Sequence, residues 1–280
     1  MYPLAIGLFS GIVLALSLYL GKASNGHWSV VWGIVLAVMV NAAFGIVMKK
    51  KISAIMERVQ GIMRDGQKKI QEKTNSWRFR PPGSIKQAKL DIEKMQHVLI
   101  SSAIAAIDPL RRYEKWSPFL SRQIATMEMH FHFQDKNFKE VDSRLGKCLF
   151  LDPMTSAMAM ARVYSRDGYK HVADKKGRKR PNEIDKYFSR AVSRLRYGQG
   201  ALIYGLMAWI FVKENKVDEA FDLLLKADRK MDNATIKHNI GLLKNNKPKQ
   251  FSLAGLGDEW YALGLEEPRI RMQSMPQKPF

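Results

Sequence analysis

The hydrophobic and polar positions divide this 280-residue chain into an apolar beginning and a long amphipathic remainder. Before residue 49 the only charged side chain is that of Lys22, and apolar runs cover residues 2–20 and 28–48. At about 1.5 Å per helical residue, each run is long enough to cross a hydrocarbon core of roughly 30 Å. Because backbone groups find no water in a bilayer, both runs are expected to be helices that pair as a transmembrane hairpin, residues 1–48.

Small residues recur in both runs at the spacing of close helix packing. Gly7 and Gly11 are four residues apart in the first run, and Gly33 and Ala37 are four apart in the second. Small side chains at this spacing allow two membrane helices to bring their backbones together. The sequence therefore predicts a close approach of the two helices at these positions.

The charges that flank the runs predict their orientation. The link between the runs has one lysine, whereas Lys49, Lys50 and Lys51 directly follow the second run. Cytoplasmic flanks carry the excess of Lys and Arg, so both termini are expected in the cytoplasm, beneath an inner (plasma) membrane crossed by two spans. A cleaved signal peptide is the rival interpretation, but residues 1–4 lack a basic side chain and a second apolar run follows.

A basic amphipathic linker, residues 49–83, follows the second run. Its apolar residues keep to one helical face, whereas a heptad pattern of the coiled-coil kind fails at Gly66 and Lys69. Three interpretations stay open: a connecting helix packed on the soluble domain, a helix lying on the bilayer surface, or a short oligomerisation coil. The apolar face consists of Ile52, Ile55, Met56, Val59, Ile62, Met63 and Ile70.

The linker ends in a break at Pro81, Pro82 and Gly83, which cannot continue a helix. Just before the break, residues 77–80 combine two aromatic rings with two arginines. Such a mixture fits interfacial anchoring near the membrane or stacking on RNA bases.

Residues 84–265 are expected to form a helical domain. Ser84 with Gln87 is a capping-box pattern that opens one helix. Ser117 followed by Pro118 predicts the start of another. Because no run alternates apolar and polar residues as a strand would, the predicted fold class of the whole chain is all-α.

One segment, residues 201–234, has large and small residues in a characteristic order. It resembles a tetratricopeptide repeat, a pair of helices in about 34 residues. Small residues at Ala208 and Ala220 would let the two helices approach, while Phe211 and Leu224 fill the seam between them. The residues that carry the resemblance are Tyr204, Met207, Ala208 and Phe211 in the first helix, and Ala220, Leu224 and Ala227 after a turn at 214–216.

Two weaker units precede it. Val141, Leu145 and Cys148 repeat the second-helix spacing in one of them, and Ile184, Phe188 and Ala191 repeat it in the other. The middle unit has an insertion of roughly nine residues, which coincides with residues 171–181. The resemblance implies an α-solenoid of helix pairs, although a generic stack of helical hairpins explains the weaker units equally well.

The resemblance also implies where a partner would bind. Partner peptides of this repeat class lie along the concave face made by the first helices, and Trp209 and Phe133 are the expected anchors because aromatic side chains dominate binding hot spots. The alternative is a groove filled by the chain's own tail or by the helix of residues 52–70. The predicted groove consists of Gln123, Thr126, His130, Phe133, Leu202, Gly205, Trp209 and Val212.

The end of the chain has two parts. Residues 251–265 are apolar but punctuated by glycines, and we expect them to cap the last apolar face of the stack. The rival interpretation is an exposed docking motif around Trp260 and Tyr261. Residues 266–280 show no periodicity and are predicted to be a disordered basic tail.

The charge of the chain is lopsided. Residues 49–280 hold 45 of the 46 Lys and Arg and all 26 Asp and Glu. A basic surface beneath a membrane is attracted to anionic lipid headgroups, but the same charge could meet RNA or only solvent. The predicted basic surface consists of Lys49, Lys50, Lys51, Lys175, Lys176, Arg178, Lys179 and Arg180.

No motif in the sequence predicts catalysis, a cofactor or a metal. His130 and His132 are two residues apart on a predicted helix and point about 200° from each other, so they cannot share one ion. The single cysteine, Cys148, allows no intrachain disulfide and is expected to be a buried small hydrophobe.

These features favour a membrane-anchored cytoplasmic scaffold that binds a protein partner through its repeat groove. Two alternatives remain: a membrane-docked factor that contacts RNA or the ribosome, and a structural subunit of a larger membrane complex. Neither the identity of the partner nor the oligomeric state follows from the sequence.

Overall fold

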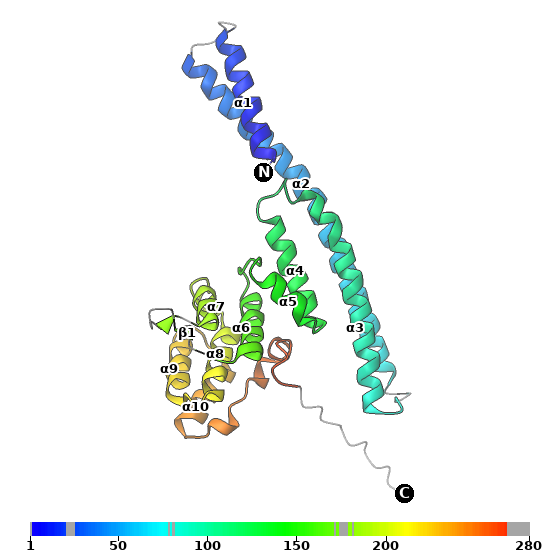
Figure 1. Cartoon of the computed structure of the whole chain (residues 1–280), viewed down its shortest axis with the longest axis vertical. Helices are drawn as coiled ribbons and strands as arrows, with labels where there is room; N and C mark the ends of the chain where they lie inside the picture. Colours follow the sequence, from blue (N-terminus) through cyan, green and yellow to red (C-terminus); the bar gives the residue numbers. More distant parts are fainter. Residues whose placement is uncertain are drawn as a thin grey trace. The chain divides into compact units, whose positions relative to one another are not determined.

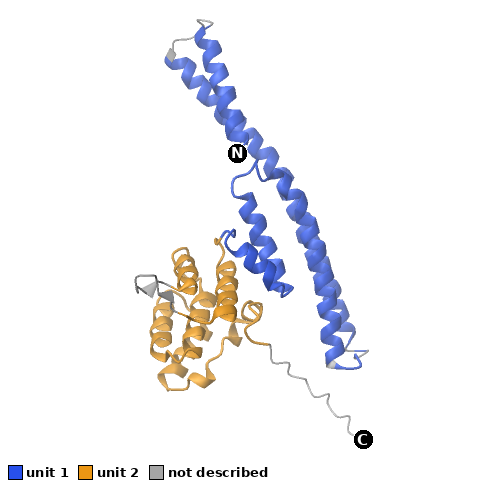
Figure 2. Ribbon diagram, in the orientation of Figure 1, with its two compact units in different colours: residues 1–149 blue, residues 150–280 orange. Residues whose placement is uncertain are grey.

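The computed structural model describes residues 2–20, 26–77, 79, 82–170, 172–173, 179–180 and 182–267. The chain forms two compact units, residues 1–149 and 150–280 (Figure 2). The boundary between them lies inside the segment 84–265, for which a single repeat domain was expected. Each unit is described separately below.

Unit 1 begins with a helical hairpin made by α1 (Tyr2–Leu20) and the first part of α2 (Gly26–Ser76). The two helices cross where Gly11 faces Gly33. A Cβ atom added to Gly11 would lie 2.5 Å from the Gly33 carbonyl oxygen, and one added to Gly33 would lie 2.6 Å from that of Gly11. No side chain fits at those distances, so the predicted close approach of small residues is confirmed.

Both helices are long and apolar enough to cross a membrane by length and composition. The outward faces of the two helices are apolar as a membrane-spanning helix requires. Large side chains such as Phe9, Leu20 and Met39 are exposed on them and do not pack against the chain. The structure therefore leaves an apolar surface on the hairpin that the described residues do not cover.

The second helix, α2, continues without a break past the apolar run. It has 51 residues, which at 1.5 Å per residue make it about 77 Å long. The segment from Lys49 to Ser76 lies beside α3 (Ile85–Ile107), which runs back antiparallel to it (Figure 1). We call this pair, α2 residues 49–76 with α3, the stalk.

A small core joins the stalk to the rest of unit 1. Val59 of α2 packs with Ile107 and Leu110, where α3 passes into the short helix η1 (Asp108–Tyr113), and with Ile124 of α4 (Leu120–Gln134). This part of the linker is therefore packed on the rest of unit 1, as the interpretation of a connecting helix predicts. The unit ends with α5 (Phe138–Leu145), which pairs with α4.

The sequence predicted the start of α3 correctly and the start of α4 incorrectly. Ser84 caps α3 as predicted, since its hydroxyl accepts a hydrogen bond from the Gln87 amide at 3.1 Å. The prediction for α4 is wrong by two residues: the helix begins at Leu120 and not at Pro118, and Phe119 occupies the cap with a φ of 66°. Tertiary packing overrides the local Ser-Pro signal here, because the preceding residue Trp116 is held against α1 and α2.

Unit 2 is a stack of helices. A two-residue antiparallel pair stands between its first two helices, with Val172 opposite Arg180, in the stretch where the sequence predicted an insertion. Together with unit 1 this confirms the all-α fold class, apart from that small pair. The elements are α6 (Pro153–Asp167), β1 (Val172–Ala173), β2 (Lys179–Arg180), α7 (Glu183–Val192), α8 (Ala201–Lys213), α9 (Val217–Asp228), α10 (Ala234–Lys244), η2 (Pro248–Gln250), η3 (Ala254–Leu256) and α11 (Asp258–Tyr261).

Neighbouring helices in the stack pair in chain order: α6 with α7, α8 with α9, and α9 with α10. The turn between α8 and α9 covers residues 214–216, where the sequence placed it. Ala208 and Ala220 are fully buried in that pair, as close helix packing requires. The helices therefore pack as consecutive hairpins.

Candidate functional site

The four predicted groove residues of unit 2 lie on α8. Leu202, Gly205 and Trp209 are buried, and Val212 is half-buried. This differs from the expectation of a face open to a partner. The reason is that the chain's own C-terminal segment lies on α8: a Cβ atom added to Gly205 would be 3.0 Å from the Leu253 side chain.

An indole pair holds this C-terminal segment in place. The rings of Trp209 and Trp260 meet edge to face with centroids 5.6 Å apart. The Glu266 carboxylate accepts a hydrogen bond from each indole N–H, at 2.8 Å from Trp209 and 3.0 Å from Trp260. Trp260 has no exposed surface, so it belongs to the core and not to an exposed docking motif.

The other four predicted groove residues lie on α4 in unit 1. Phe133 is buried and its ring meets that of Phe138, with centroids 5.9 Å apart. Thr126 is half-buried and accepts a hydrogen bond from the Leu149 amide at 2.8 Å. His130 is half-buried, and Gln123 alone of the four is exposed. The two sets of residues thus belong to different compact units, and most of them serve packing.

The predicted basic surface is described only in part. Lys49, Lys50 and Lys51 are exposed on α2, directly after the apolar run. Lys175, Lys176 and Arg178 lie outside the described residues, and of Lys179 and Arg180 only the backbone in β2 is described. Of the eight residues of the predicted basic surface, the structure therefore describes the side chains of only the three lysines on α2.

Of the ring-and-arginine cluster at residues 77–80, Arg78 and Arg80 lie outside the described residues. Trp77 follows the last residue of the unbroken helix α2, 29 positions after Met48. That separation corresponds to roughly 43 Å along the helix axis. Trp77 is therefore separated from the apolar run by a continuous stretch of helix, and interfacial anchoring of this cluster stays a prediction.

An open apolar groove runs along the stalk. It has a volume of about 580 Å³, and Val98, one of the residues that line it, is 65% exposed. Gly66 lets the Leu99 side chain rest directly on α2, which forms the floor of the groove. The walls consist of Ile62, Asp65, Gly66, Lys69, Ile70, Lys94, Met95, Val98, Leu99 and Ser102.

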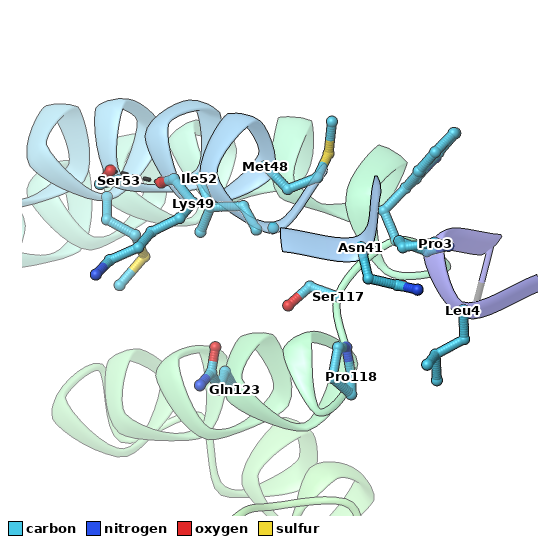
Figure 3. Close-up of a pocket in the computed structure, with 13 residues that line it drawn as sticks. Pro3, Leu4, Asn41, Met48, Lys49, Ile52, Ser53, Ser117, Pro118 and Gln123 are labelled. Carbon is cyan, nitrogen blue, oxygen red and sulfur yellow. Dashed lines mark hydrogen bonds between the residues drawn. The ribbon is translucent and has the colours of Figure 1, made fainter. Parts of the chain in front are cut away.

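A second hollow lies where the hairpin meets the rest of unit 1. We call it the junction crevice (Figure 3). Its volume is about 550 Å³, and α1, α2, α4 and the loop before α4 all contribute to its walls. The lining residues are Pro3, Leu4, Asn41, Gly45, Met48, Lys49, Ile52, Ser53, Met56, Trp116, Ser117, Pro118 and Gln123.

A ring cluster fixes one edge of the junction crevice. Trp116 packs edge to face on Tyr2, with centroids 5.3 Å apart, and stacks on Phe44 at 6.0 Å. The Tyr2 amide also donates a hydrogen bond to the Lys115 carbonyl at 3.0 Å. These contacts tie the loop before α4 to both helices of the hairpin. Sequence analysis missed this cluster, although the neighbouring run Arg111-Arg112-Tyr113 with Lys115-Trp116 mixes cations and rings as interfacial segments do.

A buried carboxylate joins three elements of unit 1 near the same place. The Glu128 side chain on α4 is 5% exposed and pairs with Arg111 of η1 and with Arg144 of α5. Its Oε2 atom accepts a hydrogen bond from Arg144 Nε at 2.8 Å. Both arginines are paired with Glu128, so the cluster fastens η1, α4 and α5 to one another.

The surroundings of the single cysteine make its thiol unreactive. Cys148 is buried, and its thiol donates to the Arg144 carbonyl at 3.3 Å. Burial raises the pKa of this thiol to about 11 from its ordinary value near 9. In the described part of the chain no group of three or more His, Cys, Asp and Glu could hold a metal ion.

The raised pKa leads to a prediction about reactivity. At pH 8 the native thiol should hold roughly a hundredfold less thiolate than an ordinary cysteine, so alkylation by iodoacetamide should be slow. Between pH 9 and about 11 an unfolded thiol ionises while the buried one does not, so folding stability should fall over that window. Alkylation rates measured from pH 7 to 11 on native and urea-unfolded protein would test this. Equal rates for the two forms at pH 8 would contradict it.

No known protein family, curated protein or solved structure matches the chain.

Proposed function

We propose that this chain is a membrane-anchored scaffold that holds a protein partner on its stalk. The observation that carries the proposal is the unbroken helix α2, which joins an apolar stretch long enough to span a membrane to the open groove of the stalk. Because one continuous helix joins the two parts, the groove would lie at a fixed distance from the bilayer. Holding a partner there raises its effective concentration beside the membrane.

Membrane insertion of the hairpin is the first part of the proposal. Exposed apolar side chains on both helices and the close contact of Gly11 with Gly33 support it, because such surfaces are stable in lipid and costly in water. The exposed lysines at 49–51 support cytoplasmic termini. The helix pairs α4–α5, α6–α7 and α8–α9 are in keeping with a tetratricopeptide-like scaffold.

The stalk groove is the second part, and its chemistry indicates the partner. Apolar walls between two antiparallel helices suit a third amphipathic helix that lays its apolar face between them. The stalk carries eleven Lys and Arg against five Asp and Glu. A second copy of the chain would therefore bring like charge, whereas a partner helix with acidic flanks would be attracted.

Insertion and orientation can be tested on native membranes. We expect the protein to stay in the pellet after alkaline washing, and its C-terminal unit to resist a protease added outside intact spheroplasts. Digestion from outside would reverse the proposed orientation, and extraction by alkali would refute the anchor.

The groove can be tested by placing a photoreactive amino acid at position 98 and identifying the protein crosslinked to it in membranes. We expect an acidic amphipathic segment at the crosslink, and binding of that purified partner should weaken at least tenfold with Val98→Asp, because a charge would enter the apolar groove. Gln96→Asp adds the same charge to an exposed position of α3 that does not line the groove, so it should bind as the wild type does. Unchanged binding with Val98→Asp would refute the groove as the partner site.

A further inference from the structure

The junction crevice extends across the boundary between the apolar and the basic parts of α2. Its lining on that helix begins at Asn41 and ends at Met56, about 22 Å along the axis, with the boundary between Met48 and Lys49 in the middle. Trp116, at its edge, stacks on Phe44 inside the apolar run. If the hairpin spans the membrane as proposed above, the crevice lies at the level of the lipid headgroups.

The two halves of the crevice differ in chemistry. Toward the apolar run the walls are formed mainly by hydrophobic groups, among them Pro3, Leu4 and Met48. Most of the hydrogen-bonding side chains are in the other half: those of Lys49 and Ser53 on α2, of Ser117 in the loop, and of Gln123 on the facing helix α4 (Figure 3). Hydrogen-bonding side chains are thus more frequent after the boundary, where Ile52 and Met56 also line the crevice, and a phospholipid has its polar group at one end in the same way.

Charge selects the headgroup. Lys49 is the one charged residue among the lining residues, so no carboxylate in the lining would repel an anion. The Lys49 ammonium, the Ser117 hydroxyl and the Gln123 amide can donate hydrogen bonds to phosphate oxygens, whereas the Ser53 hydroxyl already donates to the Lys49 carbonyl. Lys50 and Lys51 are exposed on the next positions of the helix and add attraction for anionic lipid.

We propose that the junction crevice binds one anionic phospholipid of the surrounding leaflet, with its phosphate beside Lys49 and an acyl chain against Leu4, Gly45 and Met48. The surrounding bilayer supplies this ligand at high local concentration. Water is a poor competitor in the apolar half, because few polar partners are available to it there. The lipid would also contact α1, α2 and α4 together, and so brace the hairpin against the soluble part of unit 1.

Two glycines on α2 provide a matched test. Gly45 lines the crevice, and a Cβ atom added to it would meet nothing within 4 Å. A leucine at this position should therefore enter the space of the lipid without disturbing the helix. Gly61 is equally unhindered but does not line the crevice, so Gly61→Leu is the control.

The experiment uses the full chain, delipidated in detergent and titrated with phosphatidylglycerol or phosphatidylcholine, with bound lipid counted by native mass spectrometry. We expect one tightly bound phosphatidylglycerol in the wild type and in Gly61→Leu, and at least tenfold weaker binding in Gly45→Leu. Lys49→Gln should reduce the preference for phosphatidylglycerol over phosphatidylcholine at least threefold.

Equal binding in Gly45→Leu and the wild type would overturn the proposal, as would a wild type without preference for the anionic lipid. This inference rests on the proposed membrane anchor, and a different result would refute each of the two proposals. Loss of the protein from alkali-washed membranes would refute the anchor, whereas a retained protein with unselective lipid binding would refute the crevice alone.

Discussion

Replacing Trp260 with alanine should destabilise unit 2 by about 3–5 kcal/mol, the range measured for large aromatic side chains removed from protein cores. Trp260 has no exposed surface and packs on Trp209, which lies on the central helix α8. The substitution removes a large apolar contact and leaves a cavity. It also removes one of the two indole donors to Glu266, so the C-terminal segment should loosen from α8.

The measurement is urea unfolding of the full chain in detergent, combined with hydrogen exchange of the amides of α8. Faster exchange throughout residues 201–213 is expected in Trp260→Ala. Tyr197→Ala is the control, because that ring is 84% exposed and its removal should change stability little. A loss below about 1 kcal/mol for Trp260→Ala would mean that the C-terminal segment is not part of the core.

Replacing Glu128 with alanine should cost unit 1 about 3 kcal/mol, the lower end of the range for breaking a buried ion pair. The lower end is expected because Arg111 is half-exposed and can recover water, while Arg144 is 22% exposed and recovers less. The loss arises mainly from leaving the Arg144 guanidinium without its buried partner. The free energy of unfolding of the full chain, measured by urea titration, gives the value.

The second carboxylate on Arg144 is the control for this prediction. Glu140 pairs with Arg144 from one turn away on α5 and is much more exposed than Glu128. Its hydrogen bond with Arg144 lowers the pKa of the Glu140 carboxyl, yet solvent can replace that bond when the carboxylate is removed. Glu140→Gln should therefore have a much smaller effect than Glu128→Ala. Equal effects of the two substitutions would show that burial of Glu128 does not matter.

Local signals in the sequence predicted local features well. Helix caps, turns and apolar periodicity depend on residues within a few positions of one another. This is why Ser84 at the start of α3 and the turn at 214–216 could be predicted. The contact of Gly11 with Gly33 was also predictable, because small residues four apart are themselves a local pattern.

The candidate sites were harder to predict because they depend on segments far apart in the chain. Trp209 was expected to face a partner, and only the folded chain shows that residues 251–266 lie on it. The junction crevice likewise joins Pro3 to Gln123 across more than a hundred residues. Sequence periodicity identifies an apolar face but does not identify the segment that covers it.

By itself, the sequence determined the all-α class, the two apolar helices with their close glycine contact, and the helix pair of residues 201–228. Only the tertiary structure decided that α2 continues unbroken into the stalk, that α4 begins at Leu120, and that the face of α8 is closed. The physical reason is that helix formation follows from short-range hydrogen bonds and apolar spacing, whereas burial depends on which distant surfaces meet. The surfaces left open, the stalk groove and the junction crevice, therefore became visible only in the folded chain.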